Sequence, residues 1–202
     1  MTDLPHPLQQ ICVFCGSQGG ARGEYLAAAR QLGATLAAQG VAVVYGGGHV
    51  GMMGALADAA LAAGGRVTGV IPEHLMRPEV AHQNLTERVV VDTMHTRKRI
   101  MAERADAFVV LPGGYGTFEE MFEMVTWLQL RLHAKPVGVV NVEGYFDHLL
   151  RFLRHAADEG FIRPAHWDLL IVESNPLLLL ERLRRHVPAV SRHVTLGHLD
   201  RG

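Results

Sequence analysis

The sequence predicts an α/β fold, a doubly wound and mostly parallel sheet of about seven strands with a Rossmann-like arrangement. Short runs rich in valine, isoleucine and leucine alternate with longer segments whose apolar residues recur at helical spacing. Several of these runs are apolar throughout, which is typical of parallel strands buried on both faces. Glycine-rich turns follow three of the runs, at residues 16–20, 46–48 and 113–116.

The composition fits one domain of residues 1–202, with a core of about residues 10–187 and loose tails at both ends. With 49% apolar and 19% charged residues, the chain can bury a substantial core. A net charge of −1 argues against a nucleic-acid partner, and no apolar run reaches the ~18 residues of a membrane span. The start of the chain does not resemble a signal peptide, and two cysteines fit a reducing compartment, so we expect a cytoplasmic protein.

Glycine and proline mark the ends of the elements in the first half of the chain. The helix expected at residues 22–39 ends at Gly40, and the next helix ends before Gly64. Pro72 closes the third strand, and the polar stretch 73–87 indicates an irregular loop.

The second half continues the alternation. A basic helix at residues 94–104 precedes the apolar strand 107–111, and Pro176 begins the last helix. The expected strands cover residues 10–15, 41–45, 67–71, 88–91, 107–111, 137–141 and 169–173. The expected helices cover residues 22–39, 55–63, 94–104, 117–132, 145–158 and 177–186.

The stretch 111–120 joins a buried strand to a helix and has three glycines in four positions. Such a turn directs unpaired backbone N–H groups and the positive end of the helix at one point, which suits a phosphate. Alternatively, Thr117 and Glu120 form a capping box that only completes the first helical turn. A plain helix start does not need three glycines, so we favour a ligand site.

Cys12 and Cys15 have the C-x-x-C spacing of some redox and metal sites. Both fall on the first expected strand, where residues three apart point to opposite faces of the sheet. The two thiols should therefore not meet, and we expect no redox role.

Two classes of nucleotide site fit the glycine turns. Gly46-x-Gly48-x-x-Gly51 formally matches the dinucleotide fingerprint of a nicotinamide-dependent oxidoreductase, with Glu73 as an acid for the ribose. This motif follows the second strand, however, whereas the fingerprint normally follows the first. A dinucleotide bound there would also not explain the glycine turns at residues 16–20 and 113–116. The second class is a mononucleotide held by the central turn, either as the substrate of an enzyme or as the ligand of a non-catalytic carrier or sensor.

Five stretches of the chain carry distinctive motifs, at residues 15–17, 45–54, 94–98, 112–120 and 135–138. Together they resemble the LOG ("lonely guy") family of cytokinin riboside 5′-monophosphate phosphoribohydrolases, which are often labelled lysine decarboxylases. The resemblance spans about residues 12–162, with Met52 where leucine is expected and Thr96 where glutamate is frequent. It implies hydrolysis of the N-glycosidic bond of adenosine 5′-monophosphates with cytokinin-type N6 substituents, giving the free base and ribose 5-phosphate.

The resemblance implies that Arg97, in Met-His-x-Arg-Lys, and Glu120, which ends Pro-Gly-Gly-x-Gly-Thr-x-x-Glu, are the catalytic pair. A carboxylate can stabilise the positive charge that builds on the sugar as the glycosidic bond breaks, and can activate water. Arg97 cannot protonate the leaving base, because guanidinium keeps its proton, but it can orient Glu120. In the first turn of a helix, Glu120 should be kept ionised by the helix dipole. The proton donor for the base stays open.

The remaining site residues are expected to bind the substrate. Backbone N–H groups of the central turn and the Thr117 hydroxyl would hold the phosphate, and Lys98 would add a charge. By resemblance, Glu79 contacts the base. Met94 either packs on the base or belongs to the core, as a methionine in a helix commonly does. The expected binding residues are Ser17, Gly47, Gly48, Glu79, Met94, Lys98, Gly113, Gly114, Tyr115, Gly116 and Thr117.

We expect neither a metal nor a cofactor. His49 and His95 belong to no metal-ligand motif, and the two lysines that could carry pyridoxal phosphate, Lys98 and Lys135, lie in motifs that the nucleotide site explains better. The resemblance implies a small-molecule nucleoside monophosphate as partner and a homodimer, with the helices 94–104 and 117–132 as candidate surfaces. The preferred base cannot be read from the sequence.

Overall fold

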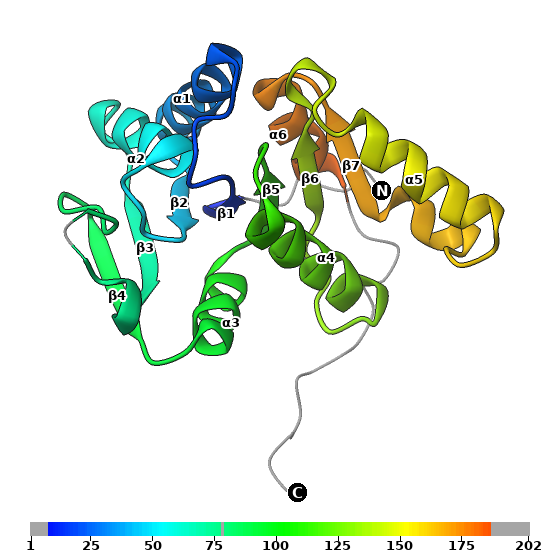
Figure 1. Cartoon of the computed structure of the whole chain (residues 1–202). Coiled ribbons are helices and arrows are strands. Elements are labelled where there is room, and N and C mark those ends of the chain that lie inside the picture. Colours follow the sequence, from blue (N-terminus) through cyan, green and yellow to red (C-terminus); the bar gives the residue numbers. More distant parts are fainter. Residues whose placement is uncertain (1–7, 78, 187–202) are drawn as a thin grey trace, which may run out of the picture.

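The computed structural model describes residues 8–77 and 79–186. Seven strands form one parallel sheet in the order β4-β3-β2-β1-β5-β6-β7 (Figure 1), which confirms the predicted α/β fold. The strands are β1 (Gln10–Phe14), β2 (Ala42–Tyr45), β3 (Val67–Pro72), β4 (Glu87–Val91), β5 (Ala107–Val110), β6 (Val137–Val140) and β7 (Leu170–Glu173). The α-helices are α1 (Gly23–Ala38), α2 (Gly51–Ala62), α3 (Met94–Arg104), α4 (Tyr115–Gln129), α5 (Asp147–Asp158) and α6 (Pro176–Arg185). Short 3-10 helices are η1 (Glu73–Leu75), η2 (Val142–Gly144) and η3 (Pro164–Leu169).

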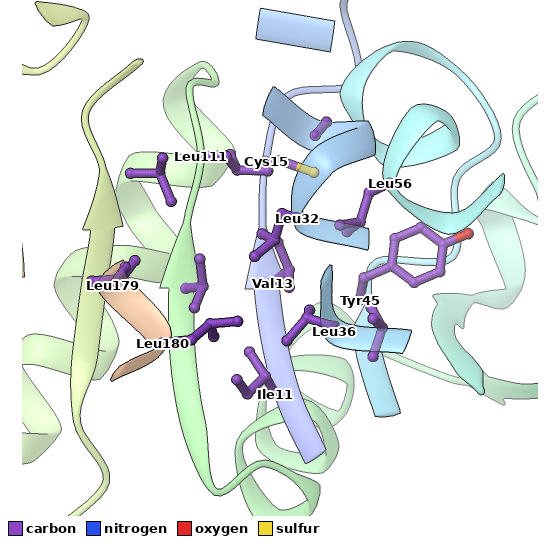
Figure 2. Packing of buried hydrophobic residues seen from close by; sticks show 14 of the residues in the cluster. Ile11, Val13, Cys15, Leu32, Leu36, Tyr45, Leu56, Leu111, Leu179 and Leu180 are labelled. Atoms are coloured by element: carbon purple, nitrogen blue, oxygen red, sulfur yellow. The ribbon is translucent and has the colours of Figure 1, made fainter. Parts of the chain in front are cut away.

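Helices cover both faces of the sheet, as the continuous apolar strands predict. Helices α1, α2 and α6 pack on one face, where Leu32, Leu56 and Leu179 belong to the same core as Ile11 and Val13 of β1 (Figure 2). Leu179 lies over β6, where it faces Gly138. Helices α3, α4 and α5 pack on the other face. Its core includes Phe14, Phe108, Met101, Met121, Met124 and Phe146.

The two cysteines lie on opposite faces of the sheet. Cys12 belongs to the core beneath α3 and α4, and Cys15 to the core beneath α1 and α2. Both are buried free thiols, and burial raises the pKa of each. The prediction that the two side chains do not meet is confirmed, because strand geometry separates residues three apart.

Several element boundaries differ from those predicted. Helix α4 begins at Tyr115, two residues earlier than predicted, with Gly114 as its N-cap and no capping side chain. The capping-box interpretation is therefore wrong, because Thr117 lies inside the helix. Helix α2 begins at Gly51 instead of residue 55. Gly51 and Gly54 belong to the first turn of this helix, where the absence of a side chain lets the backbones of Ser17 and His49 approach closely.

The strand order reverses between β1 and β5, since β2 lies on one side of this pair and β6 on the other. In open parallel sheets the carboxyl ends of such a strand pair form a crevice for ligands. The turns after these two strands touch, with the Gly16 N–H donating to the Pro112 carbonyl at 3.0 Å. Within the described residues, no helix combines the length and apolar character needed to cross a membrane.

Candidate active site

A pocket of about 250 Å³ opens at this crevice between β1 and β5. The turns after the two strands form part of its wall, and α3 and α4 supply the side chains opposite them. Eight of the predicted site residues line this pocket and so come together from distant parts of the chain. They are Ser17, Met94, Arg97, Gly114, Tyr115, Gly116, Thr117 and Glu120.

The N-terminus of α4 faces this pocket without a capping side chain. A Cβ added at Gly114 or Gly116 would meet nothing within 4 Å, so the space in front of the turn is open. Gly113 differs, since its Cβ would overlap the Thr117 hydroxyl, and its carbonyl accepts a hydrogen bond from Tyr145 Oη at 2.5 Å. The turn is thus fixed from behind while its first N–H groups stay available for an anion.

Arg97 of α3 and Glu120 of α4 face each other across the pocket. Nη1 of Arg97 lies 3.7 Å from Oε1 of Glu120, and only 9% of Arg97 and 8% of Glu120 are exposed. The Nε of Arg97 donates to the carbonyl of Val70 in β3 at 3.0 Å, and Nη1 lies 3.7 Å from the sulfur of Met94. Backbone and side chain together therefore hold the guanidinium in one place.

Burial raises the pKa of Glu120 to about 7, although the Arg97 charge lowers it. The sequence predicts the opposite direction, because it places Glu120 in the first turn of a helix, where the dipole favours the carboxylate. In the structure α4 begins at Tyr115, so Glu120 is beyond the first turn, and desolvation dominates. Near neutral pH the carboxyl can therefore exchange a proton.

Lys98 is directed to the neighbouring helix and does not line the pocket. Its Nζ donates to Glu119 and, at 3.1 Å, to Glu123, both on α4. Burial alone lowers the pKa of Lys98, but these two carboxylates outweigh burial and the pKa is raised. The lysine is thus an ionic link between α3 and α4, a different position from the predicted one at the ligand.

The second glycine turn has another arrangement than the sequence predicts. Gly47 and Gly48 do not line the pocket; the Gly47 carbonyl accepts from the His82 N–H at 2.9 Å, and Gly48 forms an antiparallel bridge with Ala81. These contacts attach the segment 79–82, which carries the exposed Glu79, to the turn. Glu79 is not part of the pocket wall.

Several pocket residues are missed by the sequence argument. Gly46 and Met53 come from the second glycine motif. Met101 lies one helical turn after Arg97, and Glu119 directly precedes Glu120. The glycine pattern marks the right segment but not which glycine faces the pocket. A residue's orientation within a turn depends on packing, which no spacing rule supplies.

The dinucleotide interpretation has little support in the geometry. A Cβ at Gly51 would overlap the backbone of Ser17, and one at Gly54 would overlap the backbone of His49. These two glycines therefore allow the chain to pack against itself, and this packing explains them without a dinucleotide. Among residues 8–77 and 79–186, no group of three or more His, Cys, Asp or Glu side chains is arranged to hold a metal.

Comparison with known proteins identifies relatives over most of the chain. The profile of a family described as "Possible lysine decarboxylase" matches residues 53–183. A probable cytokinin riboside 5′-monophosphate phosphoribohydrolase of Oryza sativa subsp. japonica is 49% identical over 180 residues, which are 89% of this chain and 79% of that protein. A cytokinin riboside 5′-monophosphate phosphoribohydrolase of Arabidopsis thaliana is 44% identical over 188 residues, which are 93% of this chain and 88% of that protein.

Solved structures share the fold at lower sequence identity. The molybdenum cofactor binding protein of Rippkaea orientalis superposes with a TM-score of 0.66 and 21% identity, covering 88% of this chain and 96% of that one. The Moco carrier protein of Chlamydomonas reinhardtii gives 0.64 and 22%, covering 88% and 98%. At these identities the likeness establishes the Rossmann-like fold alone.

Proposed function

Because the chain belongs to the LOG family of cytokinin riboside 5′-monophosphate phosphoribohydrolases, we infer that it hydrolyses the N-glycosidic bond of cytokinin nucleotides and releases the free base. Ribose 5-phosphate is the other product. One observation in the fold carries the assignment to this pocket: the uncapped N-terminus of α4 and the Arg97–Glu120 pair line the same crevice. The first suits a phosphate and the second suits the chemistry at the sugar.

The 5′-phosphate binds at the start of α4 in this proposal. Backbone N–H groups of Gly116 and Thr117, together with the Thr117 hydroxyl, contact the phosphate oxygens, and the helix dipole favours their negative charge. The open space in front of Gly114 and Gly116 supports this position. A phosphate fixed there orients the ribose relative to Glu120, which follows less than two turns along the same helix.

Glu120 acts at the sugar. As the bond to the base breaks, positive charge develops on the ribose, and the carboxylate stabilises it. Water then adds to the sugar carbon, and its proton passes to the carboxylate, whose pKa near 7 allows it to accept and later release that proton. The departing base takes up a proton of its own from solvent or another group.

Arg97 orients Glu120 and keeps the Glu120 carboxyl ionised in a fraction of the protein molecules. The guanidinium lowers the pKa of Glu120, against the effect of burial. Its contacts with Val70 and Met94 support a fixed position beside the carboxylate. Because the guanidinium holds its proton, its role is electrostatic and steric.

A homodimer and a cytoplasmic location belong to the same proposal. Apolar side chains are exposed along α3, α4 and the residues just after α4, which supports association through this surface. Two buried free cysteines fit a reducing compartment. The exposed apolar side chains of this surface include Met94, Phe122, Leu130 and Leu132.

The test is release of free base from nucleotides. Purified protein is mixed with AMP, with isopentenyladenosine 5′-monophosphate and with each matching nucleoside, and free base is measured by chromatography. Base should appear from the monophosphates only, and the ratio of their rates gives the base preference. Glu120→Gln should abolish release while the protein keeps its circular dichroism spectrum; full activity in this variant would contradict the assigned role.

A further inference from the structure

Gly46 follows β2 directly and forms part of the pocket wall against which Arg97 lies. A Cβ at this position would overlap Nη2 of Arg97, and its next contacts would be Cζ of Arg97 at 3.2 Å and Sδ of Met53 at 3.3 Å. The guanidinium therefore occupies the space that any larger residue at position 46 needs for its side chain.

The backbone does not explain a glycine at this position. Gly47 has a φ of 77°, in the left-handed region that favours glycine, whereas Gly46 is not among the glycines with positive φ. An L-residue could thus adopt the backbone of Gly46. The Arg97 side chain is what excludes one.

Other groups keep the guanidinium in this space. The Val70 carbonyl accepts from Nε at 3.0 Å, and Glu120 lies 3.7 Å from Nη1. Val70 comes one residue after the last β3 position paired with β2, so this part of β3 extends past the end of β2 at Tyr45. Arg97 fills the gap that the shorter strand and the glycine leave.

We propose that Gly46 is a positioning residue, whose missing side chain forms the socket that holds the guanidinium of Arg97 against Glu120. This inference rests on the proposed function, because it assigns a role in the same hydrolysis. An alanine at position 46 is accommodated by moving the end of a flexible side chain, so the sheet stays intact. The guanidinium then leaves Glu120, and the loss falls on kcat more than on KM.

The test is a double-mutant cycle on base release, using Gly46→Ala and Arg97→Lys. Lysine keeps the charge but lacks the Nη2 group that a Cβ at position 46 would overlap. Gly46→Ala should lower kcat at least tenfold when Arg97 is present and less than twofold in the Arg97→Lys background. Equal losses in both backgrounds, or an unchanged kcat for Gly46→Ala, would overturn the proposal.

Gly138→Ala is the matched control. Gly138 is a buried glycine of β6, and its Cβ would come within 2.7 Å of Cδ1 of Leu179, far from the Arg97 side chain. This variant should lower the melting temperature but leave kcat unchanged. If Gly138→Ala lost as much kcat as Gly46→Ala, any clash in the core would lower kcat. That result would overturn the proposal that Gly46 positions Arg97.

A second cycle separates this inference from the proposed function. The melting temperatures of wild type, Gly46→Ala, Arg97→Ala and the double variant are compared. Gly46→Ala should lower the melting temperature by several degrees only when Arg97 is present, because Arg97→Ala empties the socket. If wild type releases no base, the proposed function fails, yet this cycle still decides whether the socket exists; equal shifts in both backgrounds would overturn it.

Discussion

At the scale of single residues, the protonation of Glu120 depends on two opposing influences. Burial disfavours the carboxylate, and the nearby guanidinium of Arg97 favours it. Smaller contributions come from the charges on α3 and α4, since Lys98 lowers the pKa while Glu119 and Glu123 raise it. The outcome, a pKa of about 7, lies far above the ordinary value of 4.5.

The first prediction concerns the pH dependence of turnover. If the carboxylate form of Glu120 acts at the sugar, kcat/KM should rise with pH and level off above a midpoint near 7, because kcat/KM reports the ionisation of the free enzyme. Rates of base release between pH 5 and pH 9 check this. A kcat/KM that is constant over this range, or that falls from pH 6 to pH 8, would exclude the carboxylate as the active form.

The second prediction concerns stability. The pKa of Glu120 is raised in the folded state, so the folded protein holds this proton more tightly than the unfolded chain, and stability is lost as pH rises from 4.5 to about 7. This interval corresponds to on the order of 3 kcal/mol. Glu120→Gln cannot ionise, so the unfolding free energy of wild type relative to this variant should fall by that amount between pH 4 and pH 8.

Urea unfolding of both proteins at the two pH values measures this difference. The comparison between pH values matters more than the absolute stability, because Glu120→Gln also removes the partner of Arg97. A difference between the proteins that is the same at pH 4 and pH 8 would show that Glu120 has an ordinary pKa.

At the scale of elements, the site depends on how α3 packs beside α4. Arg97 and Lys98 are consecutive on α3, and each faces α4: one pairs with Glu120 in the pocket, the other with Glu119 and Glu123 outside it. The ionic link through Lys98 thus fixes the helix that carries Arg97. Removing Lys98 leaves two carboxylates without its charge. Water can solvate the half-exposed Glu119, whereas Glu123 is largely buried, so the cost lies between those of an exposed and a buried ion pair.

The third prediction is that Lys98→Met destabilises the protein by on the order of 1 kcal/mol and also lowers kcat, because α3 can then shift away from α4. Arg99→Met is the control, since Arg99 is exposed and pairs with Glu103 on the same helix at 3.1 Å. That change should cost less than about 0.5 kcal/mol. Chemical unfolding measures the loss of stability, and base release measures kcat. Equal changes in Lys98→Met and Arg99→Met would show that the Lys98 ion pairs do not hold α3 in place at the site.

At the scale of the whole molecule, the sheet order determines where the site lies. The reversal between β1 and β5 sends α1 to one face of the sheet and α4 to the other (Figure 1), and the pocket lies at the ends of these two strands. Met94 of α3, which is also exposed, lines the pocket at these strand ends. Tyr115 at the start of α4 is 93% exposed and lines the pocket, so a partner on this surface would approach the site.

The fourth prediction is that the protein is a homodimer through this surface and that Phe122→Glu on α4 converts it to a monomer. A buried carboxylate at a dimer interface has no favourable partner, whereas it is tolerated in water. Phe152→Glu on α5 is the control, because Phe152 is also exposed but lies on a different helix. Light scattering after size exclusion measures the mass; a dimer that persists in Phe122→Glu and dissociates in Phe152→Glu would assign the interface to α5.

Much of the fold follows from local patterns in the sequence. Continuous apolar runs predict buried parallel strands, and glycines and prolines predict most element ends, because periodicity and backbone preference act over a few residues. The opposite orientation of Cys12 and Cys15 follows from strand geometry alone. The glycines at 113–116 predict a helix start open to an anion, and the structure has one.

Tertiary packing decided what the patterns leave open. Arg97 and Glu120 lie on different helices and meet only because α3 and α4 pack on the same face of the sheet. The pKa of Glu120 is raised by burial, the partners of Lys98 come from a neighbouring helix, and Gly46 instead of Gly47 or Gly48 faces the pocket. Spacing along the chain determines which residues share a strand or a helix, whereas desolvation, pairing and side-chain space depend on residues far away in sequence, so only the folded chain determines them.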